Sequence, residues 1–80
     1  MSGGKLSFSV QKAITILKNP PYYVRIVEIA NELSVGVRAV YKWLDGGKLT
    51  KANYRAFQEY AYSILKTKDI AKCWRYGLLK

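Results

Sequence analysis

The side chains best suited to chemistry in this chain lie between positions 36 and 55. Tyr41 and Lys42 follow Arg38 by three and four residues. This spacing places each of them on the same face as Arg38 if the segment is helical. That face is basic, carries one aromatic ring and has almost no acid. Guanidinium and ammonium groups donate hydrogen bonds and accept none, so they suit partners rich in acceptors and negative charge. The spacing therefore favours recognition of a polyanion over catalysis.

Groups that could support catalysis or metal binding are sparse. The chain has no histidine, so the ordinary base for a serine or cysteine nucleophile is missing. The carboxylates are scattered along the chain and not paired in a motif: Glu28, Glu32, Asp45, Glu59 and Asp69. The single cysteine, Cys73, excludes an internal disulfide and, without histidine, the usual Cys/His zinc arrangements. We expect Cys73 in the core, and we expect no enzyme activity, no metal and no cofactor.

Composition and charge indicate one folded domain with a polyanionic partner. The 80 residues are 50% hydrophobic and 14% aromatic, which supports a single core. Lys plus Arg number 14 against 5 Asp plus Glu, a formal net charge of +9, which favours nucleic acid over an anionic membrane surface. No stretch approaches the roughly 18 apolar residues of a membrane span, and no apolar block follows the N-terminal charge. We expect a cytoplasmic protein without a secretory signal.

The stretch from Ile26 to Gly47 is expected to position the basic face. Two helical patterns are separated there by a short break, Ser34-Val35-Gly36. The apolar positions of the first pattern are Ile26, Ile29, Ala30 and Leu33, and those of the second are Val40, Trp43 and Leu44. Ala30 allows the helices to approach closely, and Val35 fills the corner between them. The outer side of the second helix then carries Gly36, Val37, Arg38, Tyr41 and Lys42.

These residues resemble the helix-turn-helix of DNA-binding proteins. The resemblance rests on Ala30, the Leu33-Ser34-Val35 corner, Val40 and Trp43-Leu44, and it covers about twenty-two of the 80 residues. The segment from Val40 to Leu44 is similar to the recognition-helix core of phage-type repressors and resolvase-like domains. An ordinary helical hairpin inside an all-α core is the alternative.

Two positions depart from the usual form of this motif. Ser34 stands where glycine is common, so its backbone either carries some strain or takes another conformation. Gly36 stands where a serine or threonine cap is frequent, and glycine costs only about a few tenths of a kcal/mol there.

The remaining sequence predicts three further helices. Residues 1–6 are interpreted as a flexible N-terminal arm and residues 7–80 as one helix-turn-helix DNA-binding domain. The predicted helices run from a cap at Ser7 or Ser9 to about Lys18, from near Val24 to about Leu33, from Val37 to Leu44, from a Thr50 cap to about Lys66, and from an Asp69 cap through Ile70, Trp74 and Leu78. This all-α bundle of about five short helices, with the second and third as the helix-turn-helix, resembles the lambda-repressor-like architecture. Tyr22 and Tyr23, in the first connection, either staple that loop to the core or bring a hydroxyl to a phosphate.

The resemblance implies a sequence-specific double-stranded DNA-binding protein, interpreted as a small transcriptional repressor that reads the major groove with the helix 37–44. The expected DNA-contacting residues are Gly36, Val37, Arg38, Tyr41, Lys42, Lys48, Lys51 and Arg55. Arg38 can bridge two acceptors of a guanine, and Val37 can touch a thymine methyl. Tyr41 and Lys42 can contact a base edge or a phosphate. The other cations of this set are assigned to backbone phosphates.

Other functions fit the same residues. One is an architectural, nucleoid-type protein that coats DNA with little sequence preference, and another is an adaptor that grips a protein. A third is an excisionase-type winged helix-turn-helix or recombination accessory factor, suggested by the run from Tyr41 to Leu44 followed by Gly47-Lys48-Leu49. Its wing requires a β-hairpin after Leu49, whereas Thr50 to Leu65 has helical spacing.

A homodimer is also expected, because a single motif of this size reads only a few base pairs. Trp74, Leu78 and Leu79, together with Tyr60 or Tyr62, form the predicted interface, although Trp74 and Leu78 can equally fill the monomer core. We expect no small-molecule ligand and no membrane partner.

Overall fold

Residues 5–77 are described by a computed structural model, with side chains described for residues 7–74. Within residues 5–77 the chain forms five helices and one two-stranded antiparallel ribbon. The helices are α1 (Val10–Lys18), α2 (Ile26–Leu33), α3 (Val37–Leu44), α4 (Lys51–Ile64) and α5 (Thr67–Cys73), and the strands are β1 (Lys5–Phe8) and β2 (Trp74–Gly77). The predicted all-α class with about five short helices is confirmed.

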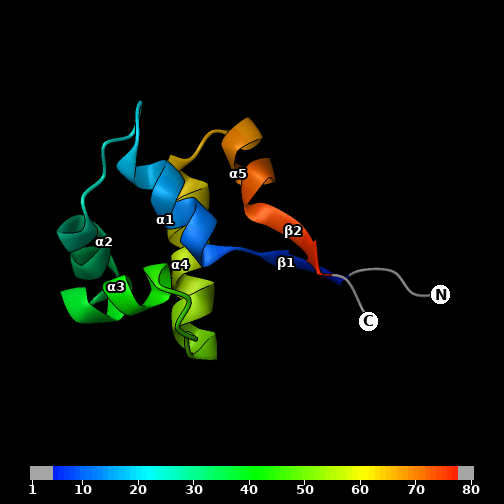
Figure 1. Ribbon diagram of the computed structural model, residues 1–80. Coiled ribbons are helices and arrows are strands. Elements are labelled where there is room, and N and C mark those ends of the chain that lie inside the picture. The colour runs from blue at the N-terminus through cyan, green and yellow to red at the C-terminus, as the bar shows by residue number, and fades with distance from the viewer. Residues whose placement is uncertain (1–4, 78–80) are drawn as a thin grey trace.

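The five helices surround a core to which α1 and α4 contribute central faces. In Figure 1, α2 and α3 lie on one side of α1 and α4, α5 lies on the other, and the ribbon projects away from the helices. The most deeply buried large side chains are Phe57, Ile14, Leu17, Ile29, Val40 and Cys73. Cys73 is thus a core residue, as predicted. None of the helices in residues 5–77 is both long and apolar enough to cross a membrane.

Local capping fixes where α1 and α4 begin. The Ser9 hydroxyl accepts a hydrogen bond from the Lys12 backbone N–H at 3.2 Å, and the Thr50 hydroxyl accepts one from the Asn53 N–H at 3.2 Å. Thr50 was the predicted cap, and Ser9 is one of the two predicted alternatives, Ser7 or Ser9. Two other boundaries differ slightly from the prediction: α2 begins at Ile26 and not near Val24, and α4 ends at Ile64 and not near Lys66. The helical segment 51–64 occupies the place where an excisionase-type wing would require a hairpin.

The turn between α2 and α3 is closed by a residue in the left-handed conformation. Ser34 has φ 56° and ψ 42°, and its N–H donates to the carbonyl oxygens of Ala30 and Asn31. The Val35 N–H also donates to the Ala30 oxygen, at 2.9 Å. This backbone conformation costs a residue with a Cβ about 1–2 kcal/mol, and glycine adopts it freely. Ser34 therefore takes the conformation that the sequence motif normally gives to glycine.

The ribbon was not predicted, and it corrects two expectations. Lys5 and Leu6, assigned to a flexible arm, belong to β1, while residues 1–4 lie outside the described residues. The last helix ends at Cys73 and not beyond Trp74, and Leu78 lies outside the described residues.

Aromatic packing explains why the chain turns into a strand at Trp74. The ring of Trp74 meets that of Phe8 edge-on at 5.3 Å, and its indole N–H donates to the Tyr62 hydroxyl at 2.7 Å. The Ser9 N–H donates to the Cys73 carbonyl oxygen at 2.7 Å. The ribbon ends at this bond, where β1 leads into α1 and α5 leads into β2. The extended backbone thus places the Trp74 ring against Phe8 and within hydrogen-bond distance of Tyr62.

Asp69 does not cap α5, contrary to the prediction. The capping position is Lys66, and Asp69 is buried within the first turn, 9% exposed. There its carboxylate accepts a hydrogen bond from the Tyr22 hydroxyl and forms an ion pair with Lys72 at 3.6 Å. The Tyr22 hydroxyl in turn accepts from the Lys66 backbone N–H at 2.9 Å. Tyr22 therefore staples the first connection to α5, whereas Tyr23 is 68% exposed.

The hydrogen bond between Tyr22 and Asp69 contributes to pKa shifts of both side chains. The hydrogen bond from Tyr22, helped by the Lys72 and Lys68 cations, holds the pKa of Asp69 below its ordinary value of 3.8, although burial acts in the opposite direction. Burial, followed by the contact with Asp69, raises the pKa of Tyr22 above 10.0. The Asp69 carboxylate stabilises the fold once the pH exceeds its unfolded-state pKa. That contribution is lost as the pH falls through the lowered folded-state pKa.

We predict that Tyr22→Phe lowers the melting temperature, because the Asp69 carboxylate loses its hydroxyl donor and the Lys66 N–H loses its acceptor. The loss of stability on acidification should also be smaller than in the wild type. Thermal unfolding followed by circular dichroism between neutral and strongly acidic pH measures both effects. The control is Tyr23→Phe, which removes an exposed hydroxyl and should melt like the wild type. Equal melting of the two variants would contradict the staple.

Candidate nucleic-acid interface

One side of α3 is fixed by burial in the core. Val40 is 0% and Trp43 5% exposed, and the ring of Trp43 meets that of Phe57 on α4 edge-on at 6.5 Å. The predicted burial of Val40 and Trp43 is therefore confirmed. Because the buried residues occupy one stripe of a two-turn helix, the opposite stripe faces solvent.

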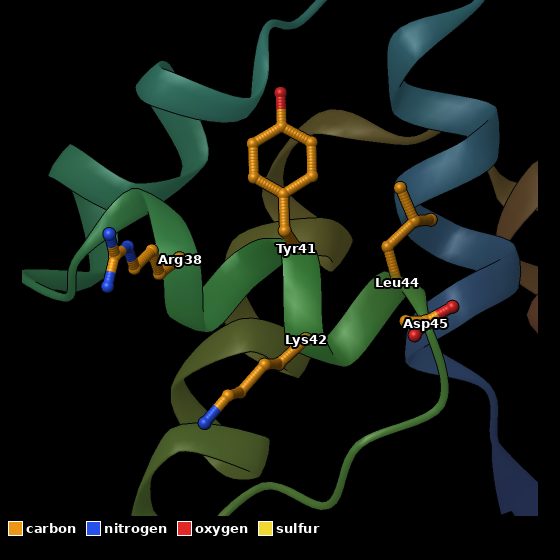
Figure 2. A pocket seen from close by; sticks show the side chains of 5 residues that line it. All are labelled: Arg38, Tyr41, Lys42, Leu44 and Asp45. Atoms are coloured by element: carbon orange, nitrogen blue, oxygen red, sulfur yellow. The ribbon is translucent and has the colours of Figure 1, made fainter.

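The exposed side of α3 carries the predicted basic residues. Arg38, Tyr41 and Lys42 line one shallow hollow together with Leu44 and Asp45 (Figure 2). Tyr41 is 54% exposed, and Arg38 and Lys42 are also exposed. Within residues 7–74 the only ion pair joins Lys72 to Asp69, so neither cation is neutralised by a carboxylate of that part of the chain. We call the five residues that line this hollow the α3 face.

The other predicted contact residues are all exposed but fall into separate groups. Gly36 precedes α3 as its N-cap, and Val37, 38% exposed, begins the helix. Lys51 and Arg55 line a second hollow on α4 with Ala52. Lys48 contributes to a third, on the side of Trp43 and Tyr54. Lys48, Lys51 and Arg55 thus line hollows different from that of the α3 face.

The C-terminal end of α3 is held by contacts that the sequence did not reveal. Gln11 Nε2, on α1, donates to the Leu44 carbonyl oxygen at 2.8 Å. The Gly47 N–H donates to the Lys42 carbonyl oxygen at 2.7 Å, and the intervening Gly46 has φ 97°. These bonds satisfy carbonyl groups that a helix end leaves unpaired, and they tie α3 to α1. The predicted glycine stop is therefore confirmed, whereas no local pattern in the sequence indicated the contact of Gln11 with Leu44.

Asp45 was interpreted only as part of the helix stop, but it also belongs to the α3 face. A signal for this was available, since Asp45 follows Arg38 by seven residues, close to two helical turns. No group of three or more His, Cys, Asp or Glu among the described residues could hold a metal ion. The chemistry offered by the α3 face is hydrogen bonding by two cations, a phenol and a carboxylate.

No protein-family model, curated protein or solved structure matches this chain.

We predict opposite effects on stability for substitutions at the glycines that flank α3. Gly47→Ala should destabilise the fold by about 1–3 kcal/mol, because a Cβ there would lie 2.9 Å from the Lys42 carbonyl oxygen. Gly36→Ser should stabilise it by about a few tenths of a kcal/mol, because the N-cap has extended backbone and open space for a capping hydroxyl. Urea unfolding measures both. A Gly47→Ala variant as stable as the wild type would contradict the described helix end.

Proposed function

We propose that this chain is a sequence-specific double-stranded DNA-binding protein that reads the major groove with α3, and that it acts as a small transcriptional repressor. The observation that carries the proposal is the α3 face, where Arg38 and Lys42 are exposed and unpaired within residues 7–74 while the opposite side of the same helix is locked in the core. A major groove is wide enough to admit one helix, and a rigid helix presents its side chains at fixed positions along the base edges.

The residues of α3 have different reach and chemistry. Arg38, in the first turn of the helix, can donate two parallel hydrogen bonds to the O6 and N7 acceptors of a guanine. Val37 offers an apolar contact to a thymine methyl. Tyr41 and Lys42 project in different directions from α3 (Figure 2), so they contact different groups of the duplex. A helix with this set reads base edges and phosphates together.

Further phosphate contacts are assigned to the cations outside the α3 face. Lys48 lies in the connection after α3, and Lys51 and Arg55 stand one turn apart at the start of α4. All three are exposed. The formal net charge of +9 supports this assignment, since the phosphate backbone supplies most of the sequence-independent affinity of such proteins.

A homodimer is part of the proposal, because two motifs about 34 Å apart on one face of the duplex give useful specificity. Tyr62, 49% exposed, is the apolar residue of the predicted interface that remains most available to a partner. Trp74 and Tyr60 are half-buried against the monomer core, and Leu78 and Leu79 lie outside the described residues.

We predict that duplexes selected from a random pool share a motif and bind about a thousandfold or more tighter than random duplex. Arg38→Ala should weaken binding to the selected duplex by about 1–3 kcal/mol and leave random duplex almost unaffected. Fluorescence anisotropy titrations measure both. The charge-matched control is Lys68→Ala on α5, across the bundle from α3 (Figure 1), which should bind like the wild type.

Other results of this experiment would favour other functions. Tight binding without a shared motif identifies a nucleoid-type protein, and failure to bind any duplex at low salt identifies an adaptor. If Arg38→Ala weakens all duplexes equally, Arg38 does not read bases.

Lys51→Ala should reduce the dependence of the binding constant on salt by about 0.9 in log–log slope, because one phosphate contact is lost. Anisotropy titrations at several salt concentrations measure the slope, and Lys68→Ala should leave it unchanged. An unaltered slope in Lys51→Ala would remove that residue from the interface.

Sedimentation tests the homodimer. We expect a dimer on DNA that contains two half-sites, and a monomer at high micromolar concentration both with and without DNA would contradict it.

A further inference from the structure

Asp45 continues the helical stripe that begins with Arg38. Its backbone, at φ −89° and ψ 9°, departs little from the helix, and its N–H still donates to the Tyr41 and Lys42 carbonyl oxygens, at 3.0 and 3.1 Å. Seven residues of an α-helix turn through about 700°, so Asp45 lies within about 20° of Arg38 around the axis. Both residues line the same hollow (Figure 2).

A carboxylate is unfavourable at this place for two independent reasons. Asp45 stands at the C-terminus of α3, where the helix dipole is negative and favours cations. It is also exposed beside the cations proposed to approach DNA, where phosphates repel it. Within residues 7–74 no ion pair compensates for either effect, because the only one found there joins Lys72 to Asp69. Asp45 gains most from a partner that donates a hydrogen bond.

The major groove contains such donors. Cytosine presents its N4 amino group there, and Asp and Glu accept hydrogen bonds from it. Guanine and thymine present acceptors at the corresponding positions, and these repel a carboxylate. Adenine has an amino group but also the N7 acceptor beside it. A carboxylate held against a base edge therefore favours cytosine and disfavours guanine and thymine.

We infer that Asp45 is a specificity-determining residue that accepts a hydrogen bond from the N4 amino group of a cytosine, about three base pairs along the groove from the base contacted by Arg38. The spacing follows from the helix rise, since seven residues advance about 10.5 Å and base pairs are about 3.4 Å apart. The inference rests on the proposed function. It adds a cytosine recognised by Asp45 to the guanine recognised by Arg38.

The end of α3 has the rigidity that this role requires. Gln11 Nε2 holds the Leu44 carbonyl oxygen at 2.8 Å, immediately before Asp45. The Gly47 N–H holds the Lys42 carbonyl oxygen at 2.7 Å, immediately after the turn. The backbone at Asp45 is thus held on both sides, so the point from which its side chain projects keeps a defined position along α3.

The test is selection of duplexes from a random pool by the wild type, by Asp45→Asn and by Arg38→Ala. We expect the wild-type motif to contain a cytosine about three base pairs from a guanine. Asp45→Asn should lose the cytosine preference or exchange it for adenine, which asparagine pairs well. Its guanine position should remain. Arg38→Ala should lose the guanine preference and keep the cytosine.

A matched control separates base reading from a simple charge effect. Glu59→Gln removes the charge of another exposed carboxylate, on α4, and should leave the base preferences unchanged. If Asp45→Asn only raises affinity for all duplexes, as the loss of a negative charge would, Asp45 does not read a base and the inference is wrong while the proposed function stands. If the wild type selects no motif, the proposed function fails and the inference with it. Thermal unfolding should show Asp45→Asn and Glu59→Gln folded, since an amide keeps the shape of the carboxylate that it replaces.

Discussion

Burial of Trp43 against Phe57 is the constraint on which the proposed interface depends, because it determines which side of α3 meets solvent. With Val40 buried on the same stripe, α3 has no freedom to rotate about its axis without exposing apolar surface. The basic side chains of the α3 face are therefore displayed by the packing of their neighbours and not by contacts of their own. A binding surface held in this way stays ordered before its partner arrives, which reduces the entropy lost on binding.

The two ends of α3 are fixed by different means. Its start follows the left-handed Ser34 turn, whose backbone hydrogen bonds close α2 on the Ala30 carbonyl. Its end is closed by Gly47 and by Gln11 from α1. The first closure is local in sequence and the second links two helices. Together they make α3 part of the bundle, although it has only eight residues.

The sequence predicted the elements that depend on local pattern and missed those that depend on distant partners. The ranges of α2 and α3 follow from apolar periodicity and a break at Ser34, so they were predicted within two residues. The exposure of Arg38 followed from the same periodicity. The ribbon, the Gln11 contact and the bond between Tyr22 and Asp69 join residues far apart along the chain, and no local pattern encodes such pairings. Trp74 is a further example. Its apolar side chain fits the periodicity of a helix, but it lies in β2, where its ring contacts Phe8 and Tyr62.

The ribbon between β1 and β2 closes the chain into a loop that contains all five helices. Pairing strands so distant in sequence has a high entropic cost, and it gains contacts only after the helices have packed. We expect the ribbon to form last during folding and its amides to exchange with solvent sooner than those of α1 or α4. Because Phe8 of β1 packs in the core against Phe57, fraying that leaves the bundle and its α3 face intact is confined to the outer part of the ribbon, from Lys5 to Ser7 and their partners on β2.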